Sequence, residues 1–483
     1  MLAQPTPSRP VPFSVKLAYS AGALTESVKA LTFGLFLLFF YTSVRGLSGT
    51  LVGTATAIVL AWDALVDPLV GRISDKTRLR FGRRHSFMLW GAILITPTFY
   101  AIFSPPGGLS GSRLAIWLIA TSLLLRTAQS VFNVPYYALG AELSSNYHER
   151  TVITGIRAVA GMAGAMAAAV FSFLVFFPQS APGTDPKFNP EAYSSMALTF
   201  GLLMSAGGLV ATVGTLGERY RLRTADADHE AGKTAWREFL PILSNRPFVL
   251  LTLSNSLFFL AVVLNATLAM HYLTYYAGIR DSSNISIFQG SFYCGALVGA
   301  GVWMRLDKIA EKHHLYFAGC LGTAVVLALA YFLVGEGRLF GTGSLTSITA
   351  GHGFAGLCAA ALWVIPHSMV ADNVDEQKRR TGSGEAARLF GVFSLAHQTA
   401  AGLALALSGY LLDHFAGLVP GTTTQSPSTV DRIGILYGLL PSALLVVSAF
   451  LILPYSLTRE RLRQIQGELG AAESAKDGDP ALL

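Results

Sequence analysis

Blocks of about twenty apolar residues recur from one end of the 483-residue chain to the other, and a stretch of that length crosses a bilayer as a helix. Hydrophobic residues make up 52% of the chain and charged residues only 13%, about half the charged fraction of a soluble globular domain. The short alternating segments typical of a transmembrane β-barrel do not occur in the sequence. The pattern predicts an all-α membrane protein.

We expect twelve transmembrane helices in two six-helix bundles. The predicted spans cover about 15–43, 50–72, 86–104, 114–140, 153–177, 195–216, 248–278, 285–304, 315–335, 345–371, 383–414 and 433–456. The predicted domains are an N-terminal bundle (1–216), a central loop (217–247), a C-terminal bundle (248–457) and a polar tail (458–483). This layout is typical of transporters whose substrate and ion sites lie near the midplane between the halves.

Lysine and arginine gather in one set of loops. This set includes 72–84, the central loop, 305–312 and 378–380, whereas each loop of the other set holds one basic residue. Because cytoplasmic loops carry the excess of Lys and Arg, we expect both termini, the central loop and the tail to be cytoplasmic, in a multi-pass protein of the plasma (inner) membrane. The bias and anionic lipid account for the net charge of +7, and we expect no nucleic-acid partner.

Two carboxylates interrupt the second predicted span. Asp63 and Asp67 lie in an apolar run from Thr50 to Gly71, and their spacing places both on one helix face. A charge at the bilayer centre costs about 2.5–3.5 kcal/mol on insertion scales, and neighbouring carboxylates repel unless a cation or proton lies between them. The spacing therefore favours a coupling-ion site.

The two halves repeat the segment around this pair. Ala64–Lys76 aligns without gaps on Ala296–Lys308, with Ala-Leu-Val and Asp-Lys at the same spacing. In the second copy Gly295 and Gly299 stand in place of the two aspartates. A purely structural pair would have no reason to be confined to one half, so we place the ion site in the N-terminal bundle.

Few other charges lie inside the spans. Four of the 35 Lys and Arg residues lie in the spans at least four residues from either end, Lys29, Arg126, Arg157 and Arg388, and the first span adds the acid Glu26. Glu26 and Lys29 are three residues apart and can share a face, either as a structural ion pair or in a substrate role. Arg157 suits bidentate contact with a carboxylate, a hydroxyl pair or a phosphate; the alternative is a helix-end anchor at the interface.

Four histidines in or near the spans are too far apart in sequence to indicate a metal site, and we expect no structural metal and no cofactor beyond the coupling ion. Among them His397 is the candidate for function, because the titration range of imidazole suits proton coupling. The three cysteines fall in apolar blocks at no metal spacing, so we expect packing roles and no disulfide.

Four motifs in order along the chain resemble those of the glycoside-pentoside-hexuronide:cation symporters of the major facilitator superfamily, typified by the melibiose permease. They are Trp62–Pro68, Phe132–Leu139 followed by Glu149-Arg150, Trp363–Asp375, and Gly384–Arg388. The resemblance covers essentially all twelve spans. It implies the major facilitator fold and a cation-coupled secondary active symporter that imports a sugar or glycoside by alternating access.

Carried over residue by residue, the resemblance makes Asp63 and Asp67 the cation ligands and gives Ser130 as a hydroxyl that helps to bind the ion. The resemblance and the buried charges together give these candidate substrate-binding residues: Glu26, Lys29, Asn133, Tyr137, Arg157, Trp363 and His397. The charged loops at the cytoplasmic helix ends give these candidate gate residues: Asp75, Arg83, Arg84, Glu142, Arg150, Asp372 and Asp375.

The sequence departs from the family pattern at three places. Val66 replaces an asparagine that helps to bind Na⁺ in the melibiose permease, Asn133 stands in place of a sugar-binding aspartate, and the first-helix acid aligns on Ser27, one residue from Glu26. Loss of the amide ligand favours H⁺ over Na⁺. Loss of both acids argues against a galactoside, because hydroxyl groups need polar partners in a buried site.

Several alternatives stay open. The same family includes animal transporters of lysophosphatidylcholine, so a cation-coupled lysophospholipid transporter is the second hypothesis, with a buried arginine or lysine holding the phosphate. An uncoupled facilitator or exporter would share the fold. A membrane enzyme would need clustered catalytic groups, and the nearest cluster, Asp372, Asp375 and Glu376, resembles the family's gate. We therefore expect no enzyme, but a monomeric transporter whose partners are a small molecule and membrane lipids.

Overall fold

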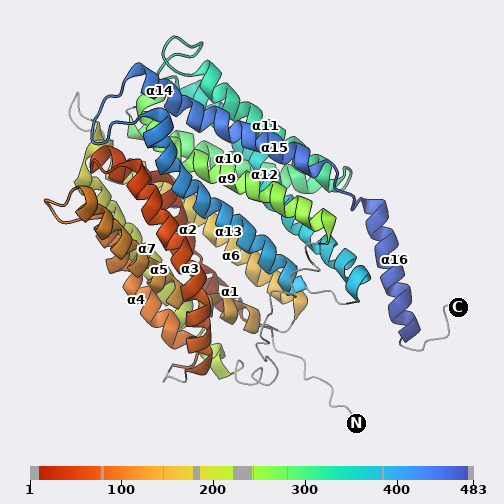
Figure 1. Cartoon of the computed structure of the whole chain (residues 1–483). Helices are drawn as coiled ribbons and strands as arrows, with labels where there is room; N and C mark the ends of the chain where they lie inside the picture. Colours follow the sequence, from red (N-terminus) through yellow and green to blue (C-terminus); the bar gives the residue numbers. More distant parts are fainter. Residues whose placement is uncertain are drawn as a thin grey trace. The chain divides into compact units, whose positions relative to one another are not determined.

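The computed structural model describes residues 10–77, 81–144, 146–177, 185–220, 242, 244–279, 281–382 and 386–476. Nearly all of these residues are helical (Figure 1), and no strand occurs among them. Inside a bilayer there is no water to satisfy the backbone, and a helix pairs its own N–H and C=O groups. The all-α prediction is therefore confirmed.

Eleven helices among the described residues are long and apolar enough to cross a membrane, and they follow the last eleven predicted spans in order. The first predicted span is different. It consists of α1 (Phe13–Ala21), α2 (Leu24–Thr32) and two short π-helical segments, η1 (Phe33–Leu37) and η2 (Phe40–Val44), in succession. The chain thus follows the twelve-span pattern, with the first span built from several short segments rather than one long helix.

The chain divides into two compact units, and unit 1 comprises Met1–Glu230, Arg280–Ser286 and Leu405–Thr429. After η2 its elements are α3 (Gly49–Lys76), α4 (His85–Phe103), α5 (Gly111–Glu142), α6 (Tyr147–Phe171), η3 (Ser172–Phe176), η4 (Pro186–Phe188), α7 (Pro190–Gly214), η5 (Leu216–Tyr220) and η9 (Leu412–Ala416). Helix α4 packs against α5 and α7, and α3 lies along α5. Helices α1 and α2 both pack on α6 and α7.

Unit 2 comprises Ala231–Ile279, Ile287–Ala404 and Val430–Leu483. Its elements are α9 (Arg246–His271), η8 (Tyr272–Tyr276), α11 (Lys312–Leu333), α12 (Leu345–Thr381), η10 (Ile435–Leu439), α15 (Leu440–Ile452) and α16 (Arg459–Lys476), with most of α10 (Ser282–Leu306) and α13 (Ala386–Leu411) and the end of α14 (Pro427–Gly434). Helix α11 packs against α12 and α15, and α9 packs against the same two helices.

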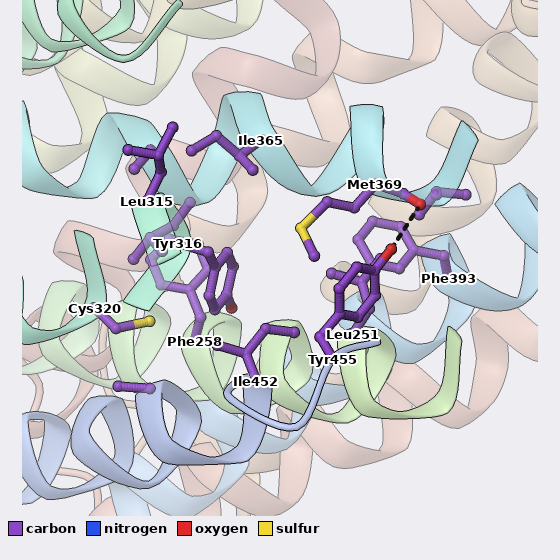
Figure 2. Close-up of a cluster of buried hydrophobic side chains, with 14 of the residues drawn as sticks. Leu251, Phe258, Leu315, Tyr316, Cys320, Ile365, Met369, Phe393, Ile452 and Tyr455 are labelled. Atoms are coloured by element: carbon purple, nitrogen blue, oxygen red, sulfur yellow. Dashed lines mark hydrogen bonds between the residues drawn. The ribbon is translucent and has the colours of Figure 1, made fainter. Parts of the chain in front are cut away.

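The core of unit 2 is apolar and aromatic (Figure 2). Phe258 of α9, Tyr316 of α11 and Met369 of α12 belong to one buried cluster. Tyr455 belongs to the same cluster, and its hydroxyl lies 3.5 Å from the carbonyl oxygen of Met369. Part of the predicted polar tail forms α16, which packs on α12 and contributes the fully buried Ile465 to this cluster.

Candidate cation and substrate site

The two predicted cation ligands lie in unit 1 on the face of α3 that meets α5. Arg126 Nε of α5 donates to Asp63 Oδ1, and one turn further along, Ser130 Oγ donates to Asp67 Oδ1 over 2.5 Å. Each acid thus faces the residue 63 positions later in the chain. The two acids on α3 are four residues apart, and so are their two partners on α5. The two helices therefore run in the same direction, with their turns in register.

Arg126 contacts more than one acid. Its Nη2 lies 3.9 Å from Asp67 Oδ2, and its Nη1 lies 4.0 Å from Glu26 Oε2 on α2. Glu26 also binds Lys29 Nζ at 2.8 Å and accepts a 3.2 Å hydrogen bond from Asn133 Nδ2. The Glu26–Lys29 pair allowed by the sequence spacing is therefore present, and it joins a larger network that contains both aspartates.

This network carries more acid than base. Glu26, Asp63 and Asp67 face two cations, Lys29 and Arg126, so the fully ionised set has one excess negative charge. Ionisable groups within a membrane pair with one another or with a mobile ion. The side chain of Asp67 is 42% exposed and that of Asp63 is 23% exposed, so Asp67 is the more accessible carboxylate.

Arg157 of α6 lies beside this network without joining it. Its guanidinium carbon lies 5.0 Å from the ring centre of Tyr137, a cation–π geometry. Tyr137 itself is 47% exposed. Among the described residues no carboxylate forms an ion pair with Arg157. A planar, permanently charged donor beside an exposed aromatic ring suits an anionic or hydroxylated ligand.

Two of the predicted substrate residues, Trp363 and His397, lie in unit 2. Trp363 of α12 packs edge to face on Phe258 and Phe292, with ring centres 6.0 and 5.9 Å apart. His397 of α13 stacks on Phe259 at 4.6 Å. The structure therefore gathers the predicted substrate residues into one charged set in unit 1 and one aromatic set in unit 2.

The predicted gate residues of unit 1 pair with one another or with nearby backbone. Glu142, at the end of α5, lies 2.8 Å from Arg84 and 3.6 Å from Arg83. Arg150 donates to the carbonyl oxygen of Ser144 over 2.5 Å. These contacts tie the end of α5 to the segment before α4 and to the start of α6.

The predicted gate residues of unit 2 also have partners within their own unit. Asp372 binds Lys312 at 2.6 Å, and Asp375 accepts a 2.9 Å hydrogen bond from Gln466 of α16. The side chain of Asp75 lies outside the described residues. Among the described residues there is no group of three His, Cys, Asp or Glu side chains that could hold a metal ion.

Arg126 is the centre of the site, although the sequence led us to count it only among the buried cations, without a role. The signal was present, because Arg126 and Ser130 have the same four-residue spacing as the two aspartates. A second missed residue is Asp413 of η9, which accepts hydrogen bonds from Ser48 Oγ at 2.7 Å and Thr50 N at 2.7 Å. Its charge complements the start of α3, where the helix dipole is positive.

Apolar spanning helices with an internal network of ion pairs are the features of a multi-pass integral membrane protein. The chain belongs to the MFS/sugar transport protein family, whose model matches residues 18–459. This membership confirms the predicted symporter family and the prediction that the protein is not an enzyme.

The relatives of this chain include transporters of two kinds of substrate. It is 22% identical to the isoprimeverose transporter of Lactiplantibacillus pentosus, over 93% of this chain and 90% of the relative. It is 23% identical to the sodium-dependent lysophosphatidylcholine symporter 1 of Xenopus tropicalis, over 96% and 91%. The inward-open xylose transporter XylE of E. coli aligns with a TM-score of 0.62 at 13% identity, over 94% of this chain and 99% of that one, which confirms the major facilitator fold.

Proposed function

We propose that the protein is a cation-coupled symporter that imports a sugar or glycoside by alternating access. One observation carries the proposal: the α3–α5 network of unit 1 has three acids against two bases, and its most exposed acid, Asp67, has a hydroxyl partner. A single monovalent cation, H⁺ or Na⁺, neutralises this set. Burying the loaded site then costs less than burying the empty one, which couples ion binding to the transport cycle.

The substrate class rests on the polar groups beside the cation site. Glu26, Lys29 and Asn133 offer donors and acceptors that suit hydroxyl groups, and the exposed ring of Tyr137 in the same unit offers an aromatic face for a sugar ring. The family description and the isoprimeverose transporter among the relatives support a carbohydrate.

A lysophospholipid is the second candidate, and a specific observation favours it. Arg157 forms no ion pair with a described carboxylate and lies over an exposed ring, so it suits a phosphate group with aromatic contact to a choline. The lysophosphatidylcholine symporter among the relatives supports this alternative. An uncoupled facilitator or exporter remains a third, less favoured, mode of the same fold.

The proposal includes the setting of the protein. We place a monomer in the plasma (inner) membrane with both termini in the cytoplasm, because the basic residues gather in the loops of that side. On this orientation the ion pairs of Glu142 and Asp372 lie at cytoplasmic helix ends, where they would stabilise one state of the gate.

The test is uptake into proteoliposomes under an imposed H⁺ or Na⁺ gradient, with a panel of radiolabelled glycosides and lysophosphatidylcholine. We expect accumulation of one class above equilibrium, and its loss in Asp63→Asn and Asp67→Asn. Glu191→Gln, which changes an exposed acid at the start of α7, serves as the matched control and should retain uptake. Gradient-driven accumulation that survives in both aspartate variants would refute the coupling site.

A further inference from the structure

The guanidinium of Arg126 occupies the position that a cation between the two aspartates would take. It donates to Asp63, and it lies 3.9 Å from Asp67 and 4.0 Å from Glu26. Arg126 comes from α5, whereas the acids come from α3 and α2, so a single side chain joins three helices. Arginine stays ionised under all conditions met in proteins, and it therefore brings a permanent positive charge to the site.

The remaining ligands are few for a metal ion. A hard cation such as Na⁺ is held by several oxygen atoms at once. Oδ1 of Asp63 already accepts from Arg126, and Val66, between the aspartates, is an apolar and buried side chain. What is left on this face is Oδ2 of Asp63, the carboxylate of Asp67 and the hydroxyl of Ser130. A second cation placed there would also lie next to the like charge of Arg126.

A proton needs fewer ligands than a metal ion. It needs one accessible carboxylate, and Asp67 is the most exposed acid of the α3 pair. Ser130 Oγ lies 2.5 Å from Asp67 Oδ1, and a hydroxyl can donate to the ionised acid or accept from the protonated one. Protonation of Asp67 removes the single excess charge of the network and leaves the Arg126–Asp63 and Lys29–Glu26 pairs in place.

The charged and titratable groups around Asp67 come from four helices. Helix α3 contributes Asp63, α5 contributes Arg126 and Tyr137, and α2 contributes Glu26 and Lys29, with Arg157 of α6 beyond the ring of Tyr137. Asp413 and His414 of η9 lie at the start of α3, beside Thr50, several turns away from Asp67.

Resting on the symporter function proposed above, we propose that Arg126 is a tethered counter-ion that takes the place of a metal cation at Asp63, so that the coupling ion is H⁺ and is carried by Asp67. Arg126 is then the residue that determines ion specificity. Removing its charge opens the space between the two carboxylates and gives the protein a metal-ion site that the wild type does not have.

The test measures Na⁺ binding without any organic substrate. Thermal unfolding of the purified full-length protein is followed in NaCl and in choline chloride at equal ionic strength. We expect no Na⁺-specific shift in Tm for the wild type, a Na⁺-dependent rise in Tm for Arg126→Gln, and loss of this rise when Asp67→Asn is added. Arg126→Lys should behave as the wild type because it keeps the charge.

The matched control is Arg157→Gln, which removes a neighbouring arginine that forms no ion pair with a described carboxylate and should gain no Na⁺ response. A Na⁺-dependent rise in Tm in the wild type would overturn the inference, even if Arg126→Gln failed to fold. A folded Arg126→Gln without a Na⁺ response would also overturn it.

Failure of this inference is distinct from failure of the proposed function. Uptake driven by a Na⁺ gradient in the wild type would remove the H⁺ assignment and the role of Arg126, but would leave symport intact. Absence of accumulation under either gradient would remove symport, whatever the Na⁺ response of the variants.

Discussion

Helices α3 and α10 contain the two copies of the same repeated segment, yet they make opposite kinds of contact. In unit 1 the aspartates of α3 meet Arg126 and Ser130 of α5 through hydrogen bonds. In unit 2 the equivalent residues of α10, Gly295 and Gly299, lie directly against the backbone of α12. A Cβ atom at either glycine would clash with a carbonyl oxygen of α12.

This difference gives a physical reason for placing the proposed ion site in one half only. Small residues let helices pack closely in lipid, and such a face leaves no room for an ion. The aspartates hold α3 and α5 together through side chains, which can exchange one partner for another. One copy of the repeat therefore forms a close backbone contact, and the other is the proposed site of a coupling ion.

The largest effect on stability is expected when an aspartate of the α3 copy is replaced by the glycine that the α10 copy has at the same position. Asp63→Gly leaves Arg126 without its closest partner. Breaking a fully buried pair costs about 3–5 kcal/mol, and this partly exposed pair should cost less than that. We expect a marked fall in Tm. In the double variant Asp63→Gly/Arg126→Met both charges are removed, and much of the stability should return. If the double variant were no more stable than the single one, the pair would not be the main polar contact of α3 and α5.

The next effect is expected when the close packing of the second copy is disturbed. Gly295→Ala places a methyl group against the carbonyl oxygen of Gly353, and overpacking costs about 1–3 kcal/mol. The control, Gly301→Ala, lies on the same helix with no atom within 4 Å of an added Cβ, and should be neutral or slightly stabilising. Equal Tm values for the two variants would show that α10 and α12 do not pack as closely as described.

A smaller effect is expected for the hydroxyl of the ion site. Ser130→Ala removes the 2.5 Å hydrogen bond to Asp67. Because Asp67 is 42% exposed and water can replace the hydroxyl, we expect the binding free energy of the coupling ion to weaken by only about 1 kcal/mol. The coupling-ion concentration for half-maximal uptake should shift about fivefold, since 1.4 kcal/mol corresponds to tenfold. Ser130→Thr keeps the hydroxyl, and a shift of the same size in this variant would argue against the hydrogen bond as the cause.

Much of the fold could be predicted from the sequence because lipid leaves the chain few choices. Apolar blocks become helices in a bilayer, so eleven of the predicted spans have matching helices. The Glu26–Lys29 pair could also be predicted, because a three-residue spacing on one helix determines which side chains are neighbours.

The rest depends on contacts between elements that are distant in sequence. The partner of Asp63 lies 63 residues away, and the register of α3 on α5 is set by packing along the whole interface rather than by a local pattern. The capping of α3 by Asp413 spans more than 360 residues, and the packing of α16 on α12 brings Ile465 from a polar segment into the core of unit 2. A single sequence can suggest such a pairing, as the equal spacing of Arg126 and Ser130 does, but it does not determine which elements meet or in what register.

The smallest effect on stability is expected for two tryptophans, one at each of the two compared helix interfaces. Trp62 donates to Thr127 over 3.1 Å between α3 and α5, and Trp303 donates to the carbonyl oxygen of Leu357 over 2.7 Å between α10 and α12. Trp303 is 8% exposed and Trp62 is 38% exposed. A buried hydrogen bond is worth about 0.5–1.5 kcal/mol, and its loss leaves the carbonyl of Leu357 with only its bond inside helix α12.

We therefore expect Trp303→Phe to lower Tm slightly and Trp62→Phe to lower it less, in parallel melts of the two purified variants. The order follows from burial, because water can reach the hydroxyl of Thr127 at the exposed interface but not the carbonyl of Leu357 at the closely packed one. The reverse order would mean that the α3–α5 contact is the more rigid of the two, contrary to an ion site that changes partners during transport.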